Sequence, residues 1–62
     1  MMKWKITLYF YPYAGGKRIC ESYEIFADSK EFAIEVAKDE FFSTPRPDGE
    51  LHVHPHNKGY ME

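Results

Sequence analysis

Residues 28–43, DSKEFAIEVAKDEFFS, are the segment of this chain whose pattern by itself predicts a helix. Asp28 can accept hydrogen bonds from the N–H groups of the first turn, and Glu31 can reach back to the Asp28 backbone, which makes a capping box. A helix of this length is marginal in water on its own, so the rest of the chain must cover its apolar face. That face, at helical spacing, consists of Ala33, Ile34, Ala37 and Phe41.

Two strands are predicted before the helix, and together they form a β-hairpin. Residues 3–11 alternate between apolar and polar side chains, as in a half-buried strand, and Pro12 ends the alternation. Gly15 and Gly16 can both adopt positive φ, which a tight two-residue turn requires. A second strand is expected over about residues 18–27.

The predicted turn also determines which residues of the two strands face each other. With the two glycines as the turn residues, Tyr11 opposes Cys20 on the outer face of the hairpin. Glu21 is an exception in the inner row, and we expect it near the open end of the hairpin, in water. The inner face, which should lie under the helix, pairs Trp4 with Ala27, Ile6 with Ile25, Leu8 with Tyr23 and Phe10 with Glu21.

A short third strand is predicted after the helix, at residues 50–54. Pro47-Asp48-Gly49 favours a tight reversal just before it. Because the helix returns the chain to its starting end, this strand can lie antiparallel beside the first strand or parallel beside the second.

The expected fold is therefore α+β in the order ββαβ: a hairpin, one helix packed across its inner face, and the short third strand. Sixty-two residues make a single small domain. We expect its ordered core at about residues 3–54 and a C-terminal tail at residues 55–62.

The composition predicts a cytoplasmic protein that is not an enzyme. The single cysteine excludes an internal disulfide and favours a reducing compartment, and no apolar run is long enough for a membrane span. No catalytic triad, phosphate loop or carboxylate pair can be placed in a cleft, so we expect neither catalysis nor a required cofactor. The net charge of −2 divides into +2 over residues 1–27 and −4 over residues 28–62. This modest dipole could orient two subunits.

The outer face of the hairpin is the predicted interaction surface. One helix can cover the inner face, but aromatic side chains remain on the other, and such residues are enriched in protein interfaces. We expect a non-enzymatic protein-interaction module that forms a homodimer and engages a protein partner. Proteins of this size are common among the accessory and inhibitor proteins of phages and mobile elements. The expected interface residues are Tyr9, Tyr11, Cys20 and Phe26, with Phe32 on the off-core side of the helix.

Three alternating histidines, in HVHPH, support a second hypothesis, a metal-binding protein. On an extended segment His52, His54 and His56 share one side, with neighbours about 7 Å apart at Cα. Two such imidazoles can reach one Zn²⁺ or Ni²⁺ at about 2.0–2.1 Å per bond, whereas the outer pair, about 13 Å apart, cannot. A complete site needs a further donor from Glu50, Asp48 or a second subunit. The alternative is three solvated histidines.

A third hypothesis is the binding of single-stranded nucleic acid. A sheet face that displays tyrosine and phenylalanine beside cations resembles in kind the aromatic platforms that stack bases. The acidic net charge argues against it, because such binders usually carry a dominant basic surface. The cations near the expected face are Lys3, Lys5, Lys17 and Arg18.

Overall fold

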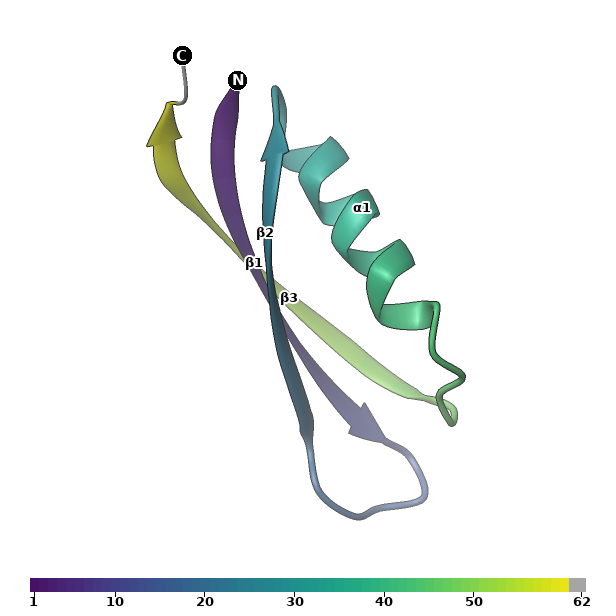
Figure 1. Cartoon of the computed structure of the whole chain (residues 1–62). Coiled ribbons are helices and arrows are strands. Elements are labelled where there is room, and N and C mark those ends of the chain that lie inside the picture. The colour runs from purple at the N-terminus through teal and green to yellow at the C-terminus, as the bar shows by residue number, and fades with distance from the viewer. Residues whose placement is uncertain (61–62) are drawn as a thin grey trace.

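The structure is a computed structural model that describes residues 1–60. Within these residues, three strands form one antiparallel sheet in the order β2-β1-β3, and one helix packs on it (Figure 1). This confirms the predicted α+β fold in the order ββαβ and places the third strand beside the first. The elements are β1 (Met2–Pro12), β2 (Ile19–Ala27), α1 (Lys30–Phe42) and β3 (Gly49–Tyr60).

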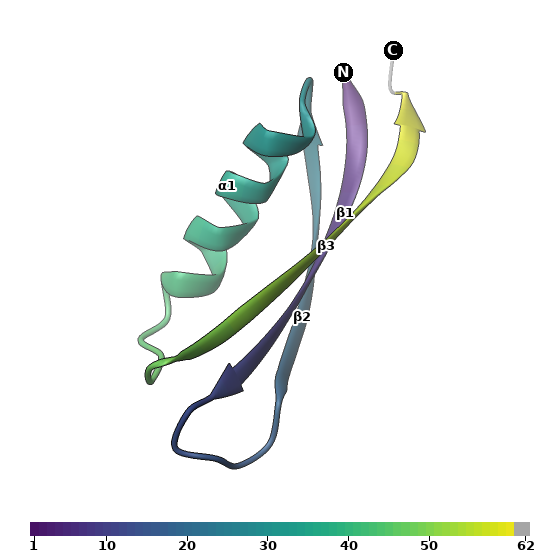
Figure 2. The same ribbon diagram turned by 180° about the vertical axis from the view of Figure 1, so that it is seen from behind.

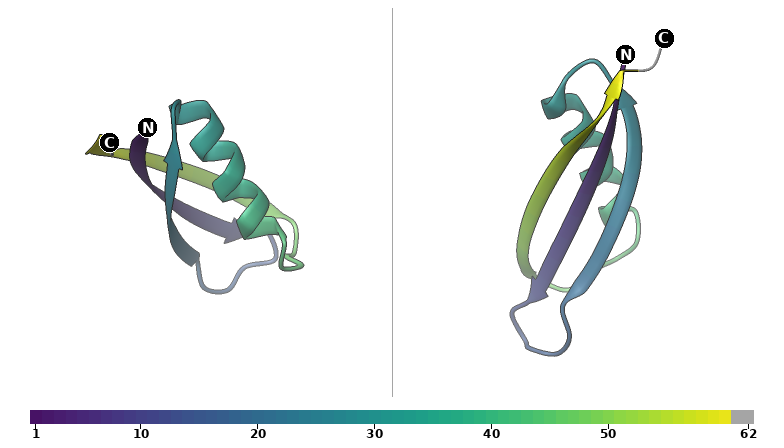
Figure 3. Two further views of the ribbon diagram at one scale, coloured as in Figure 1. Left: turned by 45° about the horizontal axis from the view of Figure 1, so that its top comes forward. Right: turned by 90° about the vertical axis from the view of Figure 1, so that its left-hand side faces the viewer.

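The sheet is long and strongly twisted, and α1 lies against one of its faces (Figures 1 and 2). The helix begins beside the end of β2 and ends near the start of β3, while β1 runs between the two other strands (Figure 3). The core lies between α1 and the alternate residues of β1, as the sequence pattern predicts. Its buried side chains are Trp4, Ile6, Leu8, Phe10, Ala27, Ala33, Ala37 and Phe41, with Ile34 half-buried.

The helix begins one residue later than the predicted capping box places it. Ser29 is the N-cap, in an extended conformation, and its side chain accepts a hydrogen bond from the Phe32 N–H at 3.1 Å. Asp28 instead lies 3.7 Å from the N-terminal ammonium of Met1. The two residues offer the same capping chemistry, and the structure uses the serine.

The register of the hairpin differs by two residues from the predicted one. Ile6 faces Tyr23 rather than Ile25, and Leu8 faces Glu21. Because side chains alternate with a period of two, every residue keeps its predicted face and only its cross-strand partner changes.

A longer connection between β1 and β2 explains the shift. Gly15 and Gly16 have positive φ, 93° and 100°, as predicted, but they lie within a loop over residues 13–18. The Gly15 N–H donates to the Pro12 carbonyl at 3.1 Å, which turns the chain directly after β1. The positive φ angles of the two glycines are therefore predicted correctly, and the two-residue length of the turn is wrong.

The third strand is much longer than residues 50–54. It continues through Pro55 to Tyr60, where the sequence predicts a tail, and residues 61–62 lie outside the described part of the chain. Pro55 faces Ile6 on β1, and β3 is an edge strand, which is where a proline is tolerated. Among residues 1–60, no helix is long and apolar enough to cross a membrane.

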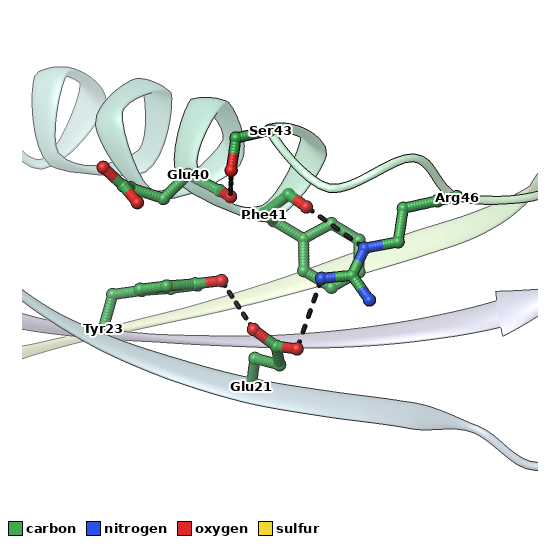
Figure 4. Close-up of polar contacts among 6 residues, drawn as sticks. All are labelled: Glu21, Tyr23, Glu40, Phe41, Ser43 and Arg46. Atoms are coloured by element: carbon green, nitrogen blue, oxygen red, sulfur yellow. Dashed lines mark hydrogen bonds and ion pairs between the residues drawn. The ribbon is translucent and has the colours of Figure 1, made fainter.

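A cluster of polar side chains connects the segment after α1 to the inner face of the sheet (Figure 4). We call this cluster, which consists of Glu21, Tyr23 and Arg46, the clasp. Glu21 accepts hydrogen bonds from the Tyr23 hydroxyl at 2.6 Å and from the Arg46 guanidinium at 3.2 Å. Arg46 also donates a hydrogen bond to the Phe41 carbonyl at 3.1 Å, and its guanidinium lies 4.0 Å from the centre of the Phe41 ring. The expectation that Glu21 lies in water is thus only partly right, because its side chain is 37% exposed and Arg46, distant in sequence, reaches it.

The clasp shifts the ionisation of two of its members. The hydrogen bond from Tyr23, helped by Arg46 and opposed by partial burial, holds the pKa of Glu21 below its ordinary value of 4.5. The same hydrogen bond, with partial burial, raises the pKa of Tyr23 to about 12. Both pKa shifts favour an ionised Glu21 that accepts a hydrogen bond from the neutral hydroxyl of Tyr23.

We expect the stability of the fold to depend on this carboxylate in a definite direction. A carboxyl group with a lowered folded-state pKa stabilises the fold above its unfolded-state pKa, and the contribution disappears as the pH falls through the folded-state value. Glu21→Gln should therefore unfold at a lower urea concentration than the wild type at pH 7, with the difference shrinking at pH 3. Glu24→Gln, which changes an exposed carboxylate, is the control. A difference for Glu21→Gln that stays constant down to pH 3 would contradict the clasp.

Candidate interaction face of the sheet

The face of the sheet opposite α1, called the outer face, collects side chains from all three strands. Strand pairing aligns them in rows across β2, β1 and β3, and their side chains are exposed or half-buried. The rows are Cys20–Tyr9–His52, Ser22–Thr7–His54 and Glu24–Lys5–His56.

At the end of the outer face nearest the β1–β2 loop, aromatic rings pack edge to face. Tyr9 and His54 have ring centres 5.2 Å apart, and Tyr11 and His52 have ring centres 5.3 Å apart. The Arg18 guanidinium lies 4.8 Å from the centre of the Tyr9 ring. Edge-to-face and cation–π contacts hold such rings in defined orientations. We call these five residues the ring cluster.

The middle of the outer face is polar. The Thr7 and Ser22 hydroxyls are 3.1 Å apart, and Lys3 lies 3.4 Å from the Glu24 carboxylate. Exposed pairs of this kind contribute little to stability, so they leave the middle of the face hydrated and adaptable.

The opposite end of the outer face borders an apolar hollow. Phe26 on β2 and Phe32 on α1 lie beside it, with 47% and 61% of their surfaces exposed. We call this feature the Phe26 hollow. Its volume is about 400 Å³, and it is lined by Met1, Phe26, Ala27, Asp28, Ser29 and Phe32.

The predicted interface residues therefore form two groups rather than one patch. Tyr9, Tyr11 and Cys20 lie at the ring-cluster end, and Phe26 and Phe32 meet at the hollow, as expected from their closeness in sequence. Phe26 faces Lys3 on β1, which places it about 20 Å along that strand from Tyr9. The exposed thiol of Cys20 faces Tyr9 rather than Tyr11, because of the register shift.

The histidines are part of the outer face, whereas the sequence pattern alone presents them as a separate feature. Leu51 and Val53 pack against the core, so the alternation of side chains along β3 turns His52 and the histidines that follow it outward. Their neighbours depend on the pairing of β3 with β1. The histidines whose rings contact the tyrosines are His52 and His54.

The three histidines of the metal-binding hypothesis lie in one row on β3. His52, His54 and His56 are exposed along the same strand, and the His52 Nε2 lies 3.4 Å from a Glu50 oxygen. Among residues 1–60, no group of three or more His, Cys, Asp or Glu side chains converges closely enough to hold a metal ion.

Comparisons of this chain with protein-family models, with curated proteins and with solved structures found no match. The functional proposal therefore rests on the geometry of the outer face.

Proposed function

We propose that this chain is a non-enzymatic protein-interaction module that self-associates through the outer face of its sheet. One observation carries the proposal: the face has oriented rings at one end, exposed Phe26 beside an apolar hollow at the other, and a polar middle. Exposed apolar patches are typical of interaction sites, and this face has one at each end. An accessory or inhibitory role toward a further protein is compatible with this surface.

The arrangement suits a two-fold dimer. In an isologous contact the same surface is used twice, so that residue i of one copy meets residue j of the other and the reverse. If two outer faces stack in opposite directions, the ring cluster of each copy lies over the Phe26 hollow of the other.

The size of the face fits this use. The principal extents of the chain are 44 × 17 × 14 Å, which makes its broad side about 750 Å². Stable interfaces of standard size bury about 800 Å² on each partner. A stacked dimer of this chain therefore needs the full outer face, including both ends.

A charge placed at either end of the face should abolish the dimer. We expect the wild type to sediment as a dimer at micromolar concentration, and Tyr11→Glu and Phe26→Glu each to sediment at the monomer mass of 7.4 kDa. The reason is that a carboxylate would be buried without a partner in the stacked contact. Tyr13→Glu is the matched control, because Tyr13 is 74% exposed in the loop after β1. It should remain a dimer.

The thiol of Cys20 gives a second readout in the same samples. Because Cys20 lies beside the ring cluster, its alkylation should slow as the protein concentration rises and should not slow in Phe26→Glu. A wild type that sediments at 7.4 kDa at every concentration would overturn the proposal.

Single-stranded nucleic acid is a second candidate, favoured by the stacking of Arg18 on Tyr9. The outer face carries Lys3, Lys5 and Arg18 against Glu24 and Glu50, so it is more basic than the whole chain. Binding of an oligonucleotide that weakens steeply between two salt concentrations would favour this candidate, because phosphate contacts release counterions.

A further inference from the structure

Strand β3 is long and forms one edge of the sheet, so the backbone groups on its outer side are available for pairing. It has 12 residues and pairs with β1 along one side. Within residues 1–60 it is an outer strand of the sheet. A strand in this position can pair with another strand through its N–H and C=O groups, and a second copy of the same strand is the simplest partner.

The side chains that β3 presents on the outer face are mainly imidazoles. His52, His54 and His56 are all exposed and are spaced by about 7 Å along the strand. The rings of His52 and His54 rest edge-on against Tyr11 and Tyr9, which limits their rotation. Oriented imidazoles are good ligands for Zn²⁺, Ni²⁺ and Cu²⁺, but one strand brings no more than two of them to one ion.

A two-fold pairing of β3 strands would complete the ligand set. In an antiparallel pair centred on His54, that residue faces His54 of the second copy, and His52 faces His56 of the second copy. The pair then has three histidine rows, the central one and two flanking ones related by the two-fold axis. Facing residues have Cβ atoms about 4.5–5.5 Å apart, so the central row and one flanking row hold four imidazoles around one point above the sheet. We propose that two copies of this chain bind a zinc ion in this way, through a histidine site that neither copy can form alone.

Pro55 explains why the pairing should depend on the metal. A proline contributes no N–H, and prolines on edge strands discourage pairing with other chains. Pro55 lies between two of the proposed ligands, so the β3 pair lacks hydrogen bonds at its centre. Metal binding supplies the missing stabilisation because only the paired state offers four ligands.

This site shares His52 and His54 with the ring cluster, and the experiment separates it from the stacked dimer. Phe26→Glu removes the proposed stacking contact, and Phe26 lies on β2, at the other edge of the sheet from β3. Zn²⁺ added to Phe26→Glu should double the sedimenting mass from 7.4 kDa, with one ion bound per two chains, and a chelator should reverse the change.

Substitutions in the same background identify the ligands. His54→Gln should weaken the response to Zn²⁺ by about tenfold or more, since even changes outside the ligand shell commonly cost that much. Glu24→Gln, which removes an outer-face carboxylate on β2, should leave the response unchanged. Amide hydrogen exchange within Gly49–Tyr60 should slow when Zn²⁺ is added, because new backbone hydrogen bonds form along β3.

Three results would overturn the site: a mass that excess Zn²⁺ does not change, a His54→Gln variant that responds like its parent, or a zinc-dependent dimer without new protection in β3. If the wild type dimerises without metal while Phe26→Glu ignores Zn²⁺, the stacked dimer stands and this site fails. If the wild type is a monomer until Zn²⁺ is added, the stacked dimer fails and this site stands.

Discussion

Replacing Phe41 with alanine is expected to lower the free energy of unfolding by about 3–5 kcal/mol. The Phe41 side chain is fully buried, and its ring centre lies 5.5 Å from that of Phe10 and 4.0 Å from the Arg46 guanidinium. A chain of this length has roughly 3–9 kcal/mol of stability in total. The variant should therefore lose a third or more of this stability and unfold at a much lower urea concentration than the wild type, as measured by circular dichroism.

The next residue provides a matched control for this prediction. Phe42 has the same side chain on the same turn of α1, but 48% of its surface is exposed. Phe42→Ala should cost about 1 kcal/mol, near the centre of the range for point substitutions. Equal losses from the two substitutions would show that the end of α1 does not pack on the sheet as described.

Replacing Ile6 with alanine is expected to cost about 2–5 kcal/mol. Ile6 is fully buried at the middle of β1, the central strand, where the surrounding side chains cannot easily collapse into a cavity. The sequence pattern predicts the same loss at Ile25, but Ile25 is only half-buried on the edge strand β2. Ile25→Ala should therefore cost clearly less than Ile6→Ala in urea unfolding. A larger loss at Ile25 would contradict the described core.

The faces of the secondary structures could be predicted from the sequence because they depend on periodicity. The alternation in residues 3–11 and the spacing of Ala33, Ala37 and Phe41 each place one apolar side toward the same core. These patterns survive a two-residue shift of register or a one-residue shift of the helix start. The fold class follows from them.

The cross-strand partners could not be predicted, because they depend on loop conformation and on contacts distant in sequence. Gly15 and Gly16 satisfy a two-residue turn and a longer loop equally well, since both need positive φ. Similarly, Glu21 is half-buried on the inner face, where Arg46 reaches it across 25 positions of the chain. No local pattern around Glu21 indicates that contact.

For the candidate site, the sequence indicated the residue types but not their grouping. The interface residues were expected in one patch, and the structure divides them between the ring cluster and the Phe26 hollow. The separation depends on the register of the hairpin, in which Phe26 faces Lys3. The predicted two-residue turn gives Phe26 a different partner on β1. The contribution of β3 to the same face required knowledge of the order of the strands.

The most direct test of the stacked dimer is a nuclear Overhauser experiment on a mixture of isotope-labelled and unlabelled chains, filtered for contacts between copies. The stacked dimer predicts contacts from the Tyr11 ring of one copy to the Phe26 ring of the other, and their loss in Phe26→Glu. Intermolecular contacts confined to other surfaces, or none at a concentration where the wild type sediments as a dimer, would contradict self-association through the outer face.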